Sequence, residues 1–319
     1  MVQSSTFDPV LNHRSAFVFP GQGSQFVGMG KDLAEWSASV RHLFEEVDEA
    51  LGTSLSSLMF TGPQETLTRT INAQPAVMVV SLACLMVAKE LIGEEQLPRA
   101  TYAAGHSLGE YTAMVAGGGL SISDGVRLVR ERGRLMQEAS ERKEGGMAAV
   151  IGLDEITLES VCLETGTQIS NVNAADQIVI AGERVALARA VDLAIARGAK
   201  RALTLRVGGA FHTALMKPAS DAIAEIIRGT PFTTPNISVI ANCTGQPLTS
   251  IEEIKQELID QLCSCVQWKQ SVSYMVDHGT SSFYEIGPGR ILSNLIRHAH
   301  PDATTVCFNN LKNIQEFAS

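Results

Sequence analysis

Short apolar segments alternate with longer amphipathic segments along most of the 319-residue chain. The segments 16–19 and 101–104 are small or apolar and short enough to be buried strands, and the second is followed by an expected helix over 108–116. Another helix is expected over 124–139. Apolar strands separated by helices are typical of a parallel sheet covered on both faces. The pattern therefore predicts an α/β core.

The pattern changes in the middle of the chain, where strands and helices are expected in the order βαββαβ, over 147–153, 154–165, 168–173, 177–182, 183–198 and 201–207. This order is that of the split βαβ in ferredoxin-like domains. The glycine pairs at 145–146 and 208–209 are interpreted as hinges on either side of it. We therefore expect a core formed by 16–140 and 210–319, with an inserted subdomain at 141–209 and a cleft between them.

Composition and charge narrow the class of protein. A hydrophobic content of 45% supplies enough apolar residues for a full core. The formal net charge of −9, without a dense cluster of lysine and arginine, argues against nucleic-acid binding. The six cysteines form no C-x-x-C pair, so we expect reduced thiols and no zinc site.

The N-terminal segment 1–15 is polar and lacks the apolar centre of a signal peptide, so a flexible tail is expected there. The longest apolar run, 76–88, is too short to cross a bilayer and is interpreted as a core helix. We expect a soluble protein that binds no membrane, in the cytoplasm or in a compartment such as the plastid stroma.

The most informative local pattern is Gly-His-Ser-Leu-Gly at 105–109, because it joins an expected strand to an expected helix. In a nucleophile elbow, the serine of G-x-S-x-G occupies a strained turn that glycines make possible. Ser107 would lie at the start of the helix, where free N–H groups favour negative charge. We identify Ser107 as the first candidate for a covalent catalyst; the alternative is an ordinary N-cap serine.

A second glycine-rich turn, 21–25, follows the first expected strand. It does not match a nucleotide-binding motif, because Phe26 and Gln25 stand where a third glycine or a Walker A glycine is needed. In an enzyme that uses Ser107, such a loop would supply a second backbone donor for an oxyanion. A simple connecting turn is the alternative.

Arg132 and His212 are two further candidates for the functional site, the first as a buried cation and the second as a base. The helix opened by Ser121 or Ser123 places Arg132 on its inward face, whereas Arg127, Arg130 and Arg134 fit a solvated face. A buried guanidinium needs a partner, which would be either an internal carboxylate or a substrate carboxylate.

His212 follows the second glycine pair and could reach Ser107 as a general base. The alternative is a hydrogen-bonded histidine at the hinge. No Asp or Glu near His212 stands out as a third member of a triad.

Eight short motifs follow one another along the chain: FPGQGSQ at 19–25, GHSLGEY at 105–111, RG at 132–133, GAFH at 209–212, LMKPA at 215–219, QL at 261–262, VQW at 266–268 and EIGPG at 285–289. In these motifs and their order, the chain resembles the malonyl-CoA:acyl-carrier-protein transacylases. The resemblance extends from residue 16 to about residue 298. It implies an α/β fold with an α/β-hydrolase-like core and an inserted ferredoxin-like subdomain.

The resemblance implies roles for individual residues. Ser107 would take the malonyl group as an ester, and His212 would be its base. The histidine would be oriented by a main-chain carbonyl in the region of Gln261. The backbone N–H groups of Gln22 and Leu108 would form the oxyanion hole.

Other implied roles concern the substrate. Arg132 would hold the malonyl carboxylate, and Gln261 would position Arg132 or the histidine. Asn173 would face the substrate from the small subdomain. Phe211 would favour malonyl over branched acyl groups.

The resemblance implies an acyltransferase that moves malonyl from malonyl-CoA to the phosphopantetheine thiol of holo-acyl carrier protein, supplying fatty acid or polyketide synthesis. The kinetics would be ping-pong, with no metal or redox cofactor, and we expect a monomer. A serine hydrolase, either a thioesterase or a patatin-like lipase, is the alternative, and a non-catalytic acyl-CoA-binding protein is another. Turnover of malonyl-CoA without an acceptor would favour the hydrolase.

Overall fold

The computed structural model describes residues 14–319. The expected tail at 1–15 therefore lies outside the described residues, apart from Arg14 and Ser15, which begin the first strand. The larger sheet has five parallel strands in the order β7-β2-β1-β8-β9. These strands are β1 (Arg14–Phe19), β2 (Ala100–Gly105), β7 (Ser238–Ile240), β8 (Thr280–Ile286) and β9 (Thr304–Phe308).

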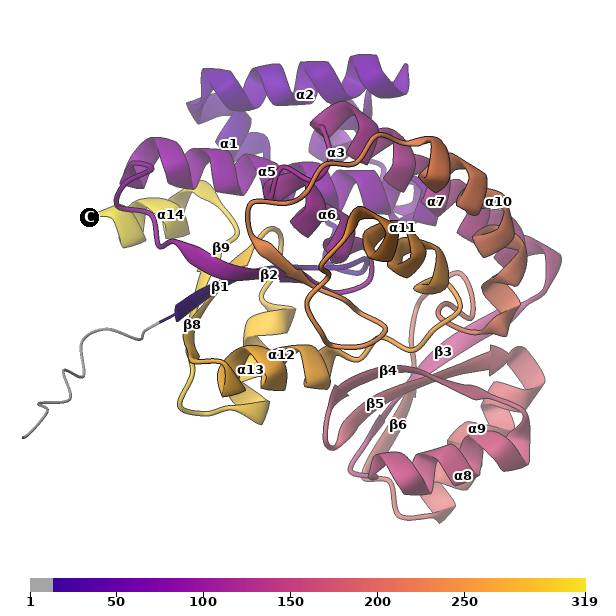
Figure 1. The fold of residues 1–319 in the computed structure, drawn as a ribbon. Helices are drawn as coiled ribbons and strands as arrows, with labels where there is room; N and C mark the ends of the chain where they lie inside the picture. The colour runs from indigo at the N-terminus through magenta and orange to yellow at the C-terminus, as the bar shows by residue number, and fades with distance from the viewer. Residues whose placement is uncertain (1–13) are drawn as a thin grey trace, which may run out of the picture.

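The central strand β1 is buried on both faces, which explains its nearly continuous apolar sequence. Phe17 and Phe19 pack into the main core, whereas Ala16 and Val18 pack into a second cluster on the opposite face. Helices α5 (Thr70–Ile92) and α6 (Leu108–Ala116) cover the first face, and α12 (Trp268–Asp277) and α13 (Ile291–Ala299) cover the second (Figure 1).

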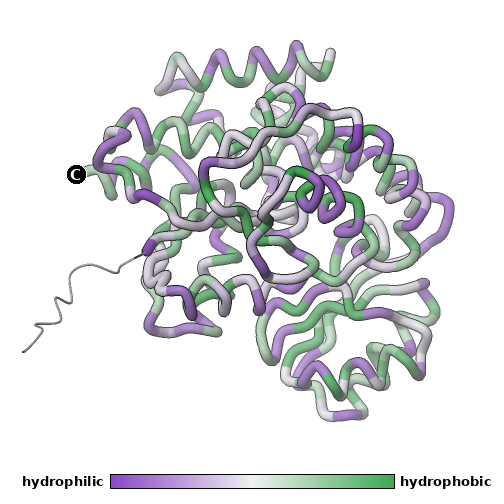
Figure 2. The backbone as a smooth tube through the Cα atoms, in the orientation of Figure 1, coloured by the Kyte–Doolittle hydropathy of each residue, from purple (hydrophilic) through white to green (hydrophobic). Residues whose placement is uncertain are grey.

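The remaining helices of this part contribute buried residues to the main core on the first face. They are α1 (Lys31–Trp36), α2 (Ala38–Leu51), α3 (Leu55–Thr61), α4 (Gln64–Thr68), α7 (Ile122–Arg142), α10 (Lys217–Gly229), α11 (Ile251–Asp260) and α14 (Leu311–Ala318), with a short 3₁₀ turn at Ala214–Met216. Helix α2 is amphipathic and buries only one side, which gives the alternation of hydrophobic and hydrophilic residues along it in Figure 2.

The apolar run expected to form a core helix lies in α5. By length and composition alone, this helix could cross a membrane, but 78% of its most apolar window is buried inside the fold. It packs against α7 and α2. Its apolar surface is thus used within the core.

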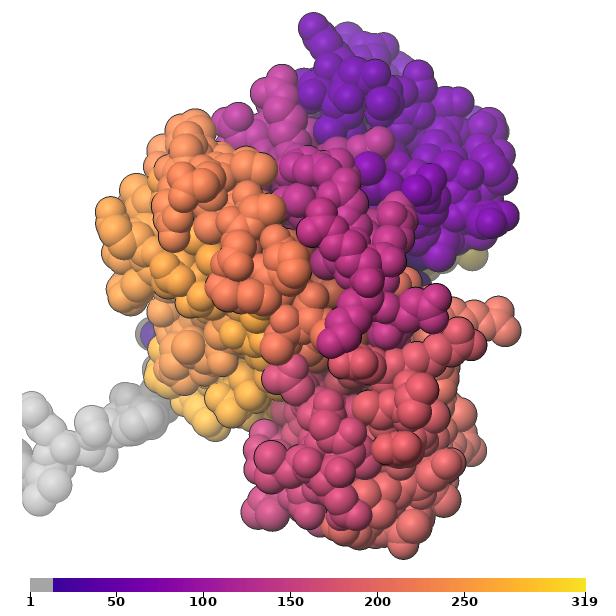
Figure 3. Space-filling view, turned by 90° about the vertical axis from the view of Figure 1, so that its right-hand side faces the viewer, coloured from indigo at the N-terminus to yellow at the C-terminus, as the bar shows by residue number. Residues whose placement is uncertain are grey.

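The smaller sheet has four antiparallel strands in the order β4-β5-β3-β6. It comprises β3 (Gly145–Ile151), β4 (Gln168–Ala174), β5 (Gln177–Glu183) and β6 (Arg201–Thr204), with α8 (Glu155–Thr165) and α9 (Arg184–Ala196) packed on one face. The elements follow one another in the expected order βαββαβ. Figure 3 shows this part of the chain projecting below the larger one.

The structure differs from the expectation at the first glycine pair. Gly145 and Gly146 belong to β3, where they pair with Glu183 and Gly182 of β5. A side chain at Gly145 would meet Ala210 Cβ at 2.8 Å, so this glycine permits close packing and is not a free hinge. The division of the chain at 141 and 209 into separate domains stays a prediction.

Candidate active site

Ser107 lies in a strained turn between β2 and α6. Its φ of 54° and ψ of −107° are unusual for a residue with a side chain. A Cβ on Gly105 would lie 1.9 Å from the carbonyl oxygen of Gly109, and a Cβ on Gly109 would lie 2.1 Å from that of Phe19. Both flanking glycines are therefore required by the close approach of three backbone segments.

Asn242 supports this turn, although no sequence motif singles it out. The backbone N–H of Ser107 donates to Asn242 Oδ1 at 2.7 Å, and Asn242 Nδ2 donates to the carbonyl of Gly105 at 2.7 Å. Asn242 is buried, so both bonds are sheltered from water. They fix the backbone on both sides of the turn.

His212 contacts Ser107 directly, with 2.7 Å between Nε2 and Oγ. Its Nδ1 lies 2.7 Å from the main-chain oxygen of Gln261. Because a carbonyl oxygen can only accept, Nδ1 carries the hydrogen and Nε2 is free to accept the hydroxyl proton. Burial, together with the positive charge of Arg132, lowers the pKa of His212 to about 3. The imidazole is therefore neutral, as a general base must be.

Arg132 is 1% exposed and lies beside the same hydroxyl. Its Nη1 donates to Gln74 Oε1 at 2.7 Å, and its Nη2 donates to Gln261 Oε1 at 2.7 Å and to Ser107 Oγ at 3.1 Å. Within residues 14–319, no carboxylate lies in ion-pair contact with this guanidinium. Burial lowers its pKa, which reflects the cost of holding the charge there.

The two expected oxyanion donors occupy suitable elements. Leu108 is the first residue of α6, so its N–H has no acceptor within the helix. Gln22 lies in the turn after β1 and lines the same cavity as Ser107. A Cβ on the neighbouring Gly21 would lie 2.6 Å from the carbonyl oxygen of His106, so this turn is packed against the elbow.

A cavity of about 430 Å³ opens at Ser107 between the two parts of the chain. From the core it is lined by Arg132, His212 and Phe211, the last of which is 6% exposed. The small sheet contributes apolar residues, Asn171 and Asn173. Asn173 Oδ1 lies 2.9 Å from Nε2 of His106, so this amide is held at the edge of the elbow.

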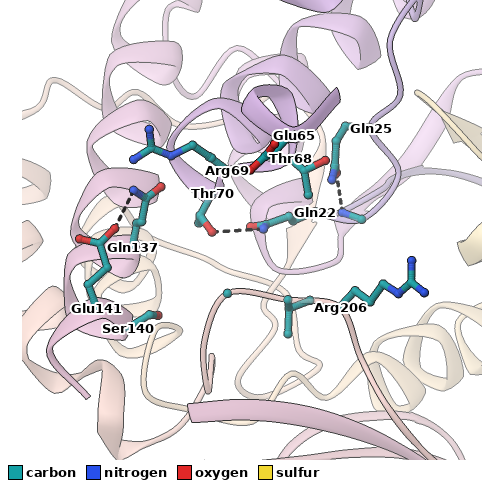
Figure 4. Close-up of a pocket in the computed structure, with 13 residues that line it drawn as sticks. Gln22, Gln25, Glu65, Thr68, Arg69, Thr70, Gln137, Ser140, Glu141 and Arg206 are labelled. Atoms are coloured by element: carbon teal, nitrogen blue, oxygen red, sulfur yellow. Dashed lines mark hydrogen bonds between the residues drawn. The ribbon is translucent and has the colours of Figure 1, made fainter. Parts of the chain in front are cut away.

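A second hollow of about 480 Å³ adjoins the first and shares Gln22 and Arg206 with it. Figure 4 shows this second hollow, where the side chain of Gln22 is hydrogen-bonded to Thr70 Oγ1 at 3.3 Å. Ser107 and His212 do not line this second hollow. The chemistry therefore centres on the 430 Å³ cavity.

The structure brings all the residues expected from the sequence to one site, and it adds Gln74 and Glu110. Gln74 is a buried glutamine inside the mostly apolar helix α5, which is a signal that sequence analysis could have used. Glu110 is fully buried and contacts Gln261. In the part of the chain from 14 to 319, no group of three or more His, Cys, Asp or Glu residues could hold a metal ion.

Known proteins of one family match this chain over most of its length. The model of the acyl transferase domain family matches residues 16–308. A malonyl CoA-acyl carrier protein transacylase from Bacillus subtilis is 43% identical over 305 residues, which cover 94% of this chain and 95% of that protein.

Solved structures of malonyltransferases are similar to this chain in both sequence and fold. The crystal structure of an acyl-carrier-protein-S-malonyltransferase from Bartonella henselae has a TM-score of 0.91 at 41% identity and covers 95% of this chain and 98% of its own. A malonyl-transacylase solved in complex with its type II PKS acyl-carrier protein has a TM-score of 0.90 at 38% identity, covering 94% and 97%. The chain therefore belongs to the acyl transferase family, among the malonyl CoA-acyl carrier protein transacylases.

Proposed function

We propose that this protein transfers the malonyl group from malonyl-CoA to the phosphopantetheine thiol of holo-acyl carrier protein, through an ester on Ser107. The observation that carries the proposal is the position of Arg132. This buried cation has neutral amide partners and lies 3.1 Å from the candidate nucleophile. A substrate that brings a carboxylate to Ser107 would supply the missing negative charge.

In the first half-reaction, Ser107 Oγ attacks the thioester carbonyl while its proton passes to Nε2 of His212. The carbonyl oxygen becomes an oxyanion, which the backbone N–H groups of Gln22 and Leu108 would stabilise. When the tetrahedral intermediate collapses, the carbon–sulfur bond breaks and the imidazolium gives the proton to the departing sulfur, which leaves as the thiol of CoA. The products are malonyl-Ser107 and free CoA.

In the second half-reaction, the phosphopantetheine thiol loses its proton to the same imidazole and attacks the ester. The carbon–oxygen bond to Ser107 breaks, and the imidazolium protonates Oγ. The same groups act in both directions, so a single site serves both thioesters and ping-pong kinetics follow. The main-chain oxygen of Gln261 holds the ring in the required tautomer throughout.

Arg132 has hydrogens available for a substrate. One Nη1 hydrogen remains beside the bond to Gln74, and the Nη2 hydrogen that now contacts Ser107 Oγ can turn to a carboxylate after esterification. Donors from both nitrogens suit bidentate binding of a planar carboxylate. A lipase or thioesterase for unsubstituted acyl chains would have no use for this charge.

We propose that the reaction needs no metal or redox cofactor, because serine, histidine and arginine supply the nucleophile, the base and the anion site. Initial rates of malonyl transfer should therefore be unchanged by a metal chelator. A cytoplasmic location would place the enzyme with its two soluble substrates.

Mass spectrometry of the protein after incubation with malonyl-CoA tests this function. We expect a malonyl adduct on the peptide that contains Ser107. The adduct should be absent from Ser107→Ala and present in Ser123→Ala, whose serine lies on α7 and bonds Glu46 outside the site. An adduct of normal yield on Ser107→Ala, or rapid release of malonate without an acceptor, would contradict the proposal.

A further inference from the structure

Gln261 is the residue through which the parts of the site are joined. Its main-chain oxygen accepts from His212, and its side-chain Oε1 accepts from Arg132 Nη2 at 2.7 Å. Its Nε2 donates to the main-chain oxygen of Ser107 at 3.0 Å and also to Oε2 of Glu110. The base, the nucleophile and the cation are therefore all hydrogen-bonded to one residue.

The side-chain amide of Gln261 serves the cation in only one orientation. Arg132 has donors and no acceptor, so it needs Oε1 facing it. If the amide turned by half a rotation, its NH₂ group would face the guanidinium and both donors would be left unsatisfied in a buried place. Some neighbour must therefore select the orientation.

The geometry points to Glu110 as that neighbour. We propose that Glu110 is a positioning residue for malonyl binding: its carboxyl group accepts from Gln261 Nε2 and thereby keeps Gln261 Oε1 on Arg132. This inference rests on the proposed function, because the aligned guanidinium matters only for an acyl group that carries a carboxylate.

Glu110 is itself held in place by its surroundings. It lies in the first turn of α6, is fully buried, and its Oε1 accepts from the backbone N–H of Asn242 at 3.4 Å. The neighbouring Glu257 instead accepts from the backbone N–H of Cys243 at 2.8 Å. Only the first of these two buried carboxyl groups is hydrogen-bonded to Gln261.

The positioning role does not depend on the charge of Glu110. Burial and the nearby Glu257 raise the pKa of Glu110, which favours its protonated form. A protonated carboxyl group still has an oxygen that can accept from Gln261 Nε2. The site thus requires a side chain at position 110 that is long enough to present an acceptor oxygen to Gln261 Nε2.

Two conservative variants separate reach from charge. Glu110→Gln keeps the length and an acceptor oxygen but removes the ionisable carboxyl group, whereas Glu110→Asp keeps the carboxyl group and withdraws it by one methylene. The readout is the ratio of kcat/KM for malonyl-CoA to kcat/KM for acetyl-CoA, which does not depend on the fraction of folded enzyme. We expect Glu110→Gln to stay within about threefold of the wild-type ratio and Glu110→Asp to lower it by about tenfold, mainly through KM for malonyl-CoA.

Glu257→Gln is the matched control and should leave the ratio unchanged. Gln261→Met alone should lower the ratio of kcat/KM for malonyl-CoA to kcat/KM for acetyl-CoA. Adding Glu110→Asp to this variant should cause no further decrease, because Glu110 acts through Gln261. Each Glu110 variant is a test by itself if the other does not fold.

A lowered ratio in Glu110→Gln with a normal ratio in Glu110→Asp would overturn the inference in favour of charge. Equal losses with both acyl groups would overturn it in favour of a purely structural role. A wild-type protein that forms no malonyl adduct would instead refute the proposed function, so the two failures are distinguishable.

Discussion

Replacing Arg132 with alanine should remove most of the preference for malonyl over acetyl. In the proposed complex, the substrate carboxylate accepts hydrogen bonds from Nη1 and Nη2 of Arg132, a residue that is only 1% exposed. Charge-assisted hydrogen bonds in such a place contribute about 1.5–3 kcal/mol each. Some of this is recovered in the variant, because water can enter the space left by the side chain.

We therefore expect malonyl transfer to lose about 2–4 kcal/mol of transition-state stabilisation, which is a decrease of roughly 30- to 900-fold in kcat/KM. Acetyl transfer should decrease by less than about tenfold, because acetyl has no carboxylate to bind. The assay measures both kcat/KM values with the same holo-carrier protein. Arg127→Ala is the control, since this arginine lies on the exposed side of the same helix and bonds the main-chain oxygen of Ala50.

Equal decreases for malonyl and acetyl in Arg132→Ala would refute this reasoning. Such a result would mean that the arginine only supports Gln74 and Gln261, and that acyl selectivity arises elsewhere. A lowered ratio in Arg127→Ala would also argue against a local effect of the buried cation.

Further predictions concern selectivity, pH and the elbow. Phe211→Ser should lower the ratio of kcat/KM for malonyl-CoA to kcat/KM for methylmalonyl-CoA, because a steric clash between the ring and the methyl branch disfavours the branched substrate by about 1–3 kcal/mol. An unchanged ratio in a folded variant would assign the selectivity to other residues. The pKa of His212 is lowered from 6.5 to about 3, so the imidazole stays unprotonated between pH 7 and pH 5. We therefore expect no decrease in kcat/KM for acylation from histidine protonation in this range. A tenfold decrease per pH unit below 6.5 would contradict this. Gly109→Ala, whose new Cβ would lie 2.1 Å from the oxygen of Phe19, should lower the free energy of unfolding in urea by about 1–3 kcal/mol or more, whereas Gly229→Ala, with open space around it, should change it little.

The features that could be predicted from the sequence are those with local causes. The elbow needs glycines at fixed offsets from Ser107, and the structure places them where backbone segments nearly touch. The inward position of Arg132 follows from helical periodicity, and that helix extends over Ile122–Arg142 with Ser121 as its N-cap. The βαββαβ order follows from alternating short apolar runs and helices.

The features that could not be predicted depend on contacts between distant segments. Asn242 supports Ser107 from 135 residues further along the chain, and nothing in its local sequence indicates this. The partner of His212 Nδ1 is a main-chain oxygen, which every residue possesses, so no side chain marks it. The interpretation of Gly145 as a hinge was wrong, because this residue is paired within the small sheet. Glycine is needed there because Ala210, on another segment of the chain, leaves no room for a side chain.

The central claim is that Ser107 holds the malonyl group between two thiols. The most direct test is to form the malonyl-enzyme, remove free CoA by gel filtration, add holo-acyl carrier protein, and follow both proteins by intact mass spectrometry. We expect the malonyl group to leave the enzyme and to appear on the phosphopantetheine of the carrier protein. Malonyl that remains on the enzyme, or that is released as free malonate while the carrier protein stays unmodified, would contradict it.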